Sequence, residues 1–227
     1  MKIIKNIAII PARGGSKRFP GKNIALLNSI PLLVHSIQYA KKNNNIIDEV
    51  YVTTDSDEIS KVALKHGAQV IKRPHHLSGD LEPTVTSLKH VLTQLSATVE
   101  TVVLLQATNP LRPCDLLQDC FTAFKNGDFD SAMTVSRNEQ KFGKINNGKY
   151  VPFNYTFGQR SQDLEPLYFE NGLLYISKAS LISNEEILGK NNFPFVINHP
   201  FANVDIDVEE DLAYAEFVLN QIKNKAQ

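Results

Sequence analysis

A basic, glycine-rich turn near the amino terminus carries the residue types best suited to chemistry. It follows an apolar stretch in the segment IIPARGGSKRFPGKNI, residues 9–24, and places four cations within ten residues: Arg13, Lys17, Arg18 and Lys22. Backbone amides beside fixed positive charge form a site for phosphate groups. A solvated surface loop is the alternative for a turn rich in lysine and arginine. However, residues 7–10 are typical of a buried parallel strand, and open α/β sheets bind ligands at the carboxyl ends of such strands. We therefore expect a nucleoside triphosphate here.

This turn differs from two common phosphate-binding motifs. Five residues separate Gly15 from the Gly21-Lys22 pair, whereas a Walker A loop has four. Asn23 stands where that loop would place a Ser or Thr for magnesium, and no GxGxxG fingerprint follows the strand. The sequence therefore indicates a different phosphate-binding fold.

A pair of aspartates near the carboxyl terminus could hold a metal ion. Asp205 and Asp207 are two residues apart in NVDID, and in a strand this spacing puts both carboxylates on one face, with Ile206 buried on the other. Mg²⁺ is commonly bound by one or two carboxylates together with phosphate oxygens of the substrate. The alternative is an acidic cluster at a helix amino terminus. Together with the basic turn, the pair predicts a nucleotide–magnesium site.

Two more polar clusters follow buried-looking segments. Gln106, Thr108, Asn109 and Arg112 come directly after VVLL at residues 102–105, at a strand's carboxyl end, and we expect them to face the same crevice as the basic turn. Arg73 follows the short apolar segment 70–71 and is either a contact to a base or phosphate or a structural residue.

Strands and helices alternate along the part of the chain that must position these side chains. We expect strands at residues 7–10, 50–53, 70–71, 102–105 and 132–135, and helices at 31–42, from a capping pair at Asp55 and Glu58 to Gly67, at 84–95, at 115–125 and at 208–222. Repeated βα winding predicts a single α/β domain, residues 1–227, with a mostly parallel sheet between helices. From about 140 to 172 the rhythm changes, which suggests an arm. Asn171-Gly172 has the composition of a tight hairpin turn, with a ligand role as the alternative.

Composition excludes several classes of protein. Lysine plus arginine and aspartate plus glutamate number 24 each in 227 residues, which argues against binding of nucleic acid or membrane surfaces by bulk charge. The first apolar run is too short for a signal peptide, and eighteen consecutive apolar residues occur nowhere. We therefore expect a soluble, cytoplasmic protein with no membrane partner. Cys114 and Cys120 lack metal-ligand spacing, and we interpret both as reduced core residues.

Seven blocks occur in an order that resembles one enzyme family. They are PARGGSKRFPGKN, TDS at residues 54–56, RPHHLSGD, LLQATNPLR, RSQDL, ENGLLYI and DIDVEEDL, and they span from about residue 7 to residue 217. The chain resembles the acylneuraminate cytidylyltransferases, which make CMP-sialic acid and related CMP-activated nine-carbon sugars. The related Kdo enzymes typically have YGSTR in the first loop, and pseudaminic acid enzymes tend to carry AGQFYW. GGSKR and ENGLLYI in this chain are more similar to the sialic and legionaminic acid enzymes.

The resemblance implies a Rossmann-like nucleotidyltransferase fold (GT-A-like) with a dimerisation arm, and a magnesium-dependent reaction of CTP with a 2-keto sugar acid in a homodimer. It implies catalytic roles for Arg13, Lys22 and Asp207, with Lys22 at the α-phosphate, and magnesium ligation by Asp205 and Asp207. The remaining implied contacts are to the nucleotide, by Ala12, Arg13, Gly14, Ser16, Lys17, Asn23 (ribose), Arg73 (cytosine) and Thr84 (near the base), and to the sugar, by Gln106 and, across the dimer interface, Arg160. Transfer to a Kdo-type or pseudaminate-type acid, or CTP binding without turnover, are the alternatives.

Overall fold

One mixed sheet forms the centre of the molecule. The structure is a computed structural model that describes residues 3–225, so the outermost residues of the predicted domain, 1–2 and 226–227, lie outside the described part. The seven strands lie in the order β11-β7-β10-β6-β1-β4-β5. Their bounds are β1 Ile3–Pro11, β4 Glu49–Thr54, β5 Gln69–Lys72, β6 Thr98–Leu104, β7 Ser131–Arg137, β10 Tyr168–Lys178 and β11 Asn192–Val196. β10 is antiparallel to both of its neighbours, and the other pairs are parallel. The expected α/β class with a mostly parallel sheet is confirmed.

Helices cover both faces of the sheet, because successive apolar side chains of a strand point to opposite faces. On β1, Ala8 and Ile10 pack with helices α1 (Leu32–Lys42), α2 (Asp57–Lys65) and α4 (Leu116–Asn126). Ile7 and Ile9 point the other way and pack with α3 (Thr84–Gln94) and α5 (Ala179–Ser183). Residues 7–10 of β1 are thus buried on both faces, as expected for the centre of a parallel sheet.

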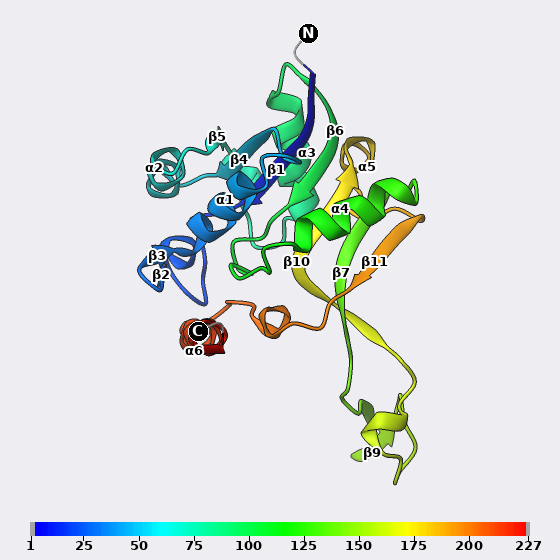
Figure 1. Ribbon diagram of the computed structural model, residues 1–227. Helices are drawn as coiled ribbons and strands as arrows, with labels where there is room; N and C mark the ends of the chain where they lie inside the picture. The colour runs from blue at the N-terminus through cyan, green and yellow to red at the C-terminus, as the bar shows by residue number, and fades with distance from the viewer. Residues whose placement is uncertain (1–2, 226–227) are drawn as a thin grey trace.

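A third apolar cluster holds the carboxyl-terminal helix α6 (Glu209–Lys225) beside the loops that follow the sheet. Val204 and Ile206, which precede α6, are buried in this cluster together with Ala215 and Val218 of the helix. Figure 1 shows α6 on the side of the molecule where β2 (Leu26–Leu27) and β3 (Ile30–Pro31) pair. Packing of α6 therefore fixes where the aspartates just before it lie.

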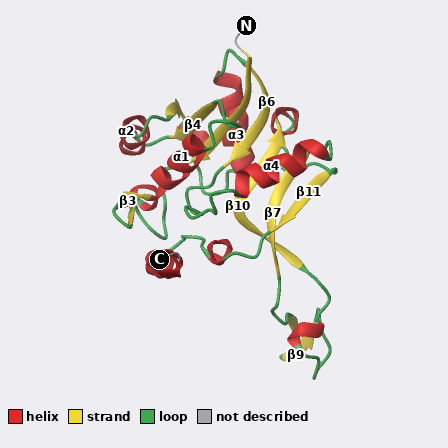
Figure 2. Cartoon of the chain, in the orientation of Figure 1, coloured by secondary structure: helices red, strands yellow, loops and turns green. Residues whose placement is uncertain are grey.

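The segment between β7 and β10 leaves the body of the molecule (Figures 1 and 2). It holds the small hairpin β8 (Gly143–Asn146) and β9 (Lys149–Pro152) and a short 3-10 turn, η3, at Ser161–Asp163. The last residues of the predicted arm, 168–172, are part of β10 and run back into the central sheet. A helix long and apolar enough to cross a membrane is not found between residues 3 and 225.

Four local expectations were wrong. Asn171-Gly172 is not a hairpin turn, because β10 continues through it with a bulge, pairing with β7 on both sides. The NVDID segment is not a strand: Asn203 ends the 3-10 turn η4 (Pro200–Asn203), Asp207 lies in a bend, and the segment pairs with no strand of the described sheets. Ser56, not Asp55, caps α2: its hydroxyl accepts from the Ile59 amide. Cys120 is buried, but Cys114 is exposed, so only one of the two cysteines is a core residue.

Candidate functional site

Loops at the carboxyl ends of β1, β4, β5 and β6 meet at one edge of the sheet. Adjacent parallel strands necessarily end at the same edge, so residues 12–21, 55–56, 73–83 and 105–112 are brought together there. Three of these loops, 12–21, 73–83 and 105–112, line a cavity of about 420 Å³. The predicted residues that line it are Arg13, Ser16, Lys17, Lys22, Asn23, Arg73, Thr84, Gln106, Asp205 and Asp207. Predicted residues from Arg13 to Asp207, far apart in the sequence, therefore line one cavity.

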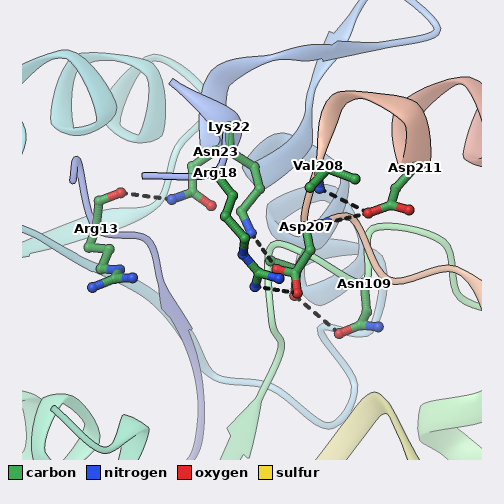
Figure 3. Close-up of polar contacts among 9 residues, drawn as sticks. Arg13, Arg18, Lys22, Asn23, Asn109, Asp207, Val208 and Asp211 are labelled. Carbon is green, nitrogen blue, oxygen red and sulfur yellow. Dashed lines mark hydrogen bonds and ion pairs between the residues drawn. The ribbon is translucent and has the colours of Figure 1, made fainter. Parts of the chain in front are cut away.

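Two side chains, those of Asp55 and Asn23, fix the backbone of the basic turn by hydrogen bonds. The Gly14 amide donates to Asp55 at 2.8 Å, and the Asn23 side-chain amide donates to the Arg13 carbonyl oxygen at 2.9 Å (Figure 3). Asn23 is buried, so part of its hydrogen-bonding capacity supports the turn. Ala12 is buried as well, with its amide bonded to Thr53, and neither Ala12 nor Gly14 lines the cavity. These two residues shape the turn from behind.

Asp207 binds two of the predicted phosphate-binding cations. Its carboxylate accepts from Lys22 at 2.9 Å and from Arg18 at 2.6 Å (Figure 3). The Lys22 hydrogen bond is the main reason that the pKa of Asp207 lies below its ordinary value. The amino-terminal turn and the late aspartate pair therefore meet across one cavity, as expected.

Asp205 has the opposite electrostatic environment. Burial, and then the negative charge of Asp207, raise the pKa of Asp205, while Thr108 donates to it. The segment is fixed by the Ile206 amide, which donates to the Thr108 carbonyl oxygen at 2.8 Å, and by Asp211, which accepts from the Asp207 and Val208 amides. Ile206 is buried, so the predicted division of side chains holds although the segment is not a strand. Two neighbouring carboxylates that repel each other beside a cavity lined by cations fit the donor set of Mg²⁺.

Asp80 is a site residue that the sequence reading missed. Its carboxylate binds Arg13 at 2.7 Å and Lys17 at 2.5 Å, and these contacts, Lys17 first, lower the pKa of Asp80. It lies in the RPHHLSGD block after β5, at the same edge as the basic turn, and that position was the available signal. Both predicted triphosphate cations are therefore neutralised by an internal carboxylate.

Arg73 lies at the back of the cavity. One of its terminal nitrogens donates to the Thr53 carbonyl oxygen at 2.6 Å, and burial lowers the pKa of Arg73. Its Nε is buried and has no partner within residues 3–225. A buried guanidinium with an unused donor at a cavity wall is suited to a polar ligand group.

A second cavity of about 390 Å³ adjoins the first, and Gln106 and Asp205 line both. Its wall on β10 includes Glu170 and Tyr175, whose hydroxyl donates to Glu170 at 3.1 Å. Burial and the Glu170 charge raise the pKa of Tyr175. The bulge in β10 contributes Asn171 and Gly172 to the lining, and we call this part of the lining the floor of the cavity. Gly172 has a φ of 75°, and a Cβ at this position would lie 2.7 Å from Asn109.

Two of the residues singled out in the sequence line neither cavity of this chain. Arg160 lies in the arm, bonded to Asp163 at 2.7 and 3.1 Å, and lines neither cavity of this chain. Arg112 does not face the crevice. It is buried on the other side of the 105–112 loop, because its long side chain reaches back under the loop to bond Gln106 and Leu173.

Comparison with known proteins agrees with this geometry. A family model described as cytidylyltransferase matches residues 7–225. The chain is 32% identical to CMP-N,N'-diacetyllegionaminic acid synthase of Legionella pneumophila, over 92% of this chain and 94% of that protein. It is 28% identical to N-acylneuraminate cytidylyltransferase of Streptococcus agalactiae, over 98% of this chain but only 56% of that protein, so the chain spans about half the length of this relative. Among solved structures, CMP:2-keto-3-deoxy-manno-octonic acid synthetase complexed with CTP has the same fold, with a TM-score of 0.71, 16% identity, and 96% and 99% of the two chains covered.

Proposed function

Because the chain belongs to the cytidylyltransferase family, we propose that it transfers CMP from CTP to the anomeric hydroxyl of a nine-carbon 2-keto sugar acid and releases pyrophosphate. The acceptor is an N-acylneuraminate or a relative such as legionaminate. The observation that carries this proposal is the pair of adjoining cavities. One is lined by cations and the aspartate pair, the other by amide and carboxylate residues and one tyrosine, and they share Gln106 and Asp205.

CTP occupies the first cavity. Its triphosphate replaces Asp80 on Arg13 and Lys17, and the α-phosphate lies at Lys22, whose ammonium group is largely withdrawn from solvent. Arg73, with its unused Nε, contacts the cytosine, and Asn23 and Thr84 contact the nucleoside from the sides. A cavity lined by fixed cations suits a ligand of high negative charge.

The sugar acid occupies the second cavity with its anomeric hydroxyl at the junction. The hydroxyl oxygen forms a bond to the α-phosphorus in line as the bond to pyrophosphate breaks, and the hydroxyl proton is released to water. Such transfers depend on positioning and on charge stabilisation, which explains why lysine, arginine and aspartate dominate the site and no nucleophilic serine or cysteine is required. Asp205 and Asp207 would hold Mg²⁺, which neutralises phosphate charge when bound.

We further propose that the chain acts as a homodimer through the arm. The arm exposes several large apolar side chains, namely Phe142, Ile145, Tyr150, Val151, Phe153 and Phe157. A lone monomer would leave this surface in water, and a second copy would cover it. Arg160 would then meet the sugar carboxylate of the partner's site. Both cysteines are unpaired, which supports a cytoplasmic location.

One assay tests the proposal. Pyrophosphate release is measured with CTP and Mg²⁺ and a panel of sialic, legionaminic, pseudaminic and Kdo acids, and reactions without any acid are the blank. Release with a sialic or legionaminic acid supports the main proposal, and release only with Kdo or pseudaminic acid moves the acceptor class. Tight CTP binding without release with any acid would support a nucleotide-binding protein instead.

A further inference from the structure

Arg112 is a buried cation that is balanced by hydrogen bonds instead of a carboxylate. Only 7% of it is exposed. Its Nε donates to the Leu173 carbonyl oxygen at 2.5 Å, one terminal nitrogen to the Ser36 hydroxyl at 3.0 Å, and the other to the Gln106 carbonyl oxygen at 2.9 Å. The Tyr39 ring centre lies 5.6 Å from the guanidinium carbon. Burial lowers the pKa of Arg112 to about 10, so the side chain stays charged at neutral pH.

The three bonded segments converge on the wall between the two cavities. The Gln106 carbonyl oxygen accepts from Arg112 and, at 3.2 Å, from Ser36, so the backbone of Gln106, a residue that lines both cavities, is fixed by two donors. Leu173 directly follows Gly172, which lines the second cavity. Arg112 therefore ties the shared wall and the floor of the second cavity to helix α1.

A buried guanidinium is not needed merely to fill the core position that Arg112 occupies. Apolar side chains of similar volume often replace buried charges without loss of stability, because the desolvation of an ion offsets most of its attraction to its partners. A planar guanidinium, by contrast, can hold several acceptors in one fixed geometry. The acceptors here are the Ser36 hydroxyl and the carbonyl oxygens of Gln106 and Leu173, so one side chain fixes three segments relative to one another.

We propose that Arg112 is a positioning residue for the sugar acid: it holds Gln106 at the junction of the cavities and affects the reaction through Gln106. This inference rests on the proposed function. The cations of the first cavity lie on other segments, after β1 and β5. Loss of the Arg112 fork should therefore act on the sugar acid and spare CTP.

The test is Arg112→Lys, which keeps the charge but loses the fork. Small displacements of positioning groups cost up to about 10²-fold, so we expect kcat/KM for the sugar acid to fall about 10- to 100-fold while the dissociation constant of CTP changes less than about twofold. In a Gln106→Ala background the same change should have little further effect, since residues that act as a unit are non-additive. Ser36→Ala removes one hydrogen bond of Arg112 and one of Gln106. It should also lower kcat/KM for the sugar acid without weakening CTP binding, but by a smaller factor, and it replaces Arg112→Lys in the test if that variant folds poorly.

Asn43→Ala is the matched control. It removes a buried hydrogen bond to the Tyr39 carbonyl oxygen of α1, the helix that also carries Ser36, and Asn43 has no hydrogen bond to Gln106. This variant should lower the melting temperature without changing the KM of the sugar acid. Equal losses of CTP and sugar acid binding in Arg112→Lys, or full additivity with Gln106→Ala, would overturn the inference. Hydrogen exchange of residues 105–112 gives a readout independent of turnover: protection should fall in Arg112→Lys and not in Asn43→Ala. Unchanged protection of residues 105–112 in Arg112→Lys overturns the inference, even if no sugar acid is found to react. A wild-type protein that is inactive with every sugar acid, but shows the predicted exchange difference between the variants, contradicts only the proposed function.

Discussion

Replacing Lys22 by methionine removes one charge from the wall of the nucleotide cavity while keeping the length of the side chain. Lys22 is 12% exposed, and its ammonium group lies 2.9 Å from Asp207. If it meets the α-phosphate, its loss removes a donor aimed at the charge that develops in the transition state. Such a loss typically costs about 10² to 10³ in rate, or about 2.7 to 4 kcal/mol. We expect kcat to fall by that factor.

The stability of the fold should change little. Asp207 keeps its contact with Arg18 at 2.6 Å, and its side chain is 39% exposed, so water can replace the lost partner. Partly exposed pairs contribute about 1 kcal/mol or less, which corresponds to about 2–4 °C in melting temperature for a chain of this size. The pKa of Asp207 should also rise, because the Lys22 hydrogen bond is the main cause of its depression.

Pyrophosphate release and thermal unfolding are measured on Lys22→Met and on Arg18→Met. Both variants lose a contact to the same carboxylate, but Arg18 is 68% exposed, so its loss should reduce turnover far less. Equal effects of the two variants, or turnover of Lys22→Met within tenfold of wild type, would refute the assignment of Lys22 to the α-phosphate.

Four more predictions test other parts of the site. Asp80→Asn should bind CTP about two- to fivefold more tightly in calorimetry, since the triphosphate no longer displaces a carboxylate from Arg13 and Lys17; weaker binding would make Asp80 a contact to the nucleotide or its metal. The lowered pKa of Asp207 means that the unfolded chain binds more protons in acid, so its stabilising contribution is present above about pH 4 and lost as pH falls through the folded value; Asp207→Asn should reduce the acid slope of unfolding measured from pH 6 to pH 2. Gly172→Ala should lose about 1–3 kcal/mol in denaturant titration, because its φ is 75° and a Cβ would lie 2.7 Å from Asn109; an unchanged midpoint would show that the bulge can relax. Mixed dimers of Arg160→Ala and Lys22→Met subunits should regain activity in one of their two sites; failure to do so would place Arg160 in its own subunit's site, and full activity of Arg160→Ala alone would place it outside both.

Local patterns in the sequence were sufficient for the class of fold and for most of the cavity. The four apolar residues before the basic turn, and the polar residues that follow later apolar runs, are short-range signals, and the rule that parallel strands end at one edge converts them into a common site. Arg13, Lys22 and Gln106 could be placed in this way. Asp207 joined them through a motif resemblance and through the donor preference of magnesium.

The partners of these groups could not be predicted, because they depend on loop conformation and on helix packing. The bond between Arg18 and Asp207 joins residues 189 positions apart, and it forms because α6 packs beside the sheet's loops. Asp80 reaches Arg13 and Lys17 through a loop whose path no periodic pattern specifies.

The sequence by itself determined which residues could bind phosphate and metal, because charge and the spacing of apolar residues are local properties. Only the tertiary structure decided which way Arg112 points and what Asn171-Gly172 does. A polar side chain after a strand can turn toward the cavity or back beneath its loop, and the choice depends on acceptors supplied by other elements, here the carbonyl oxygen of Leu173 and the hydroxyl of Ser36. In the same way, Asn171-Gly172 has the composition of a hairpin turn but forms a bulge, because β10 pairs with β7 on both sides of these two residues.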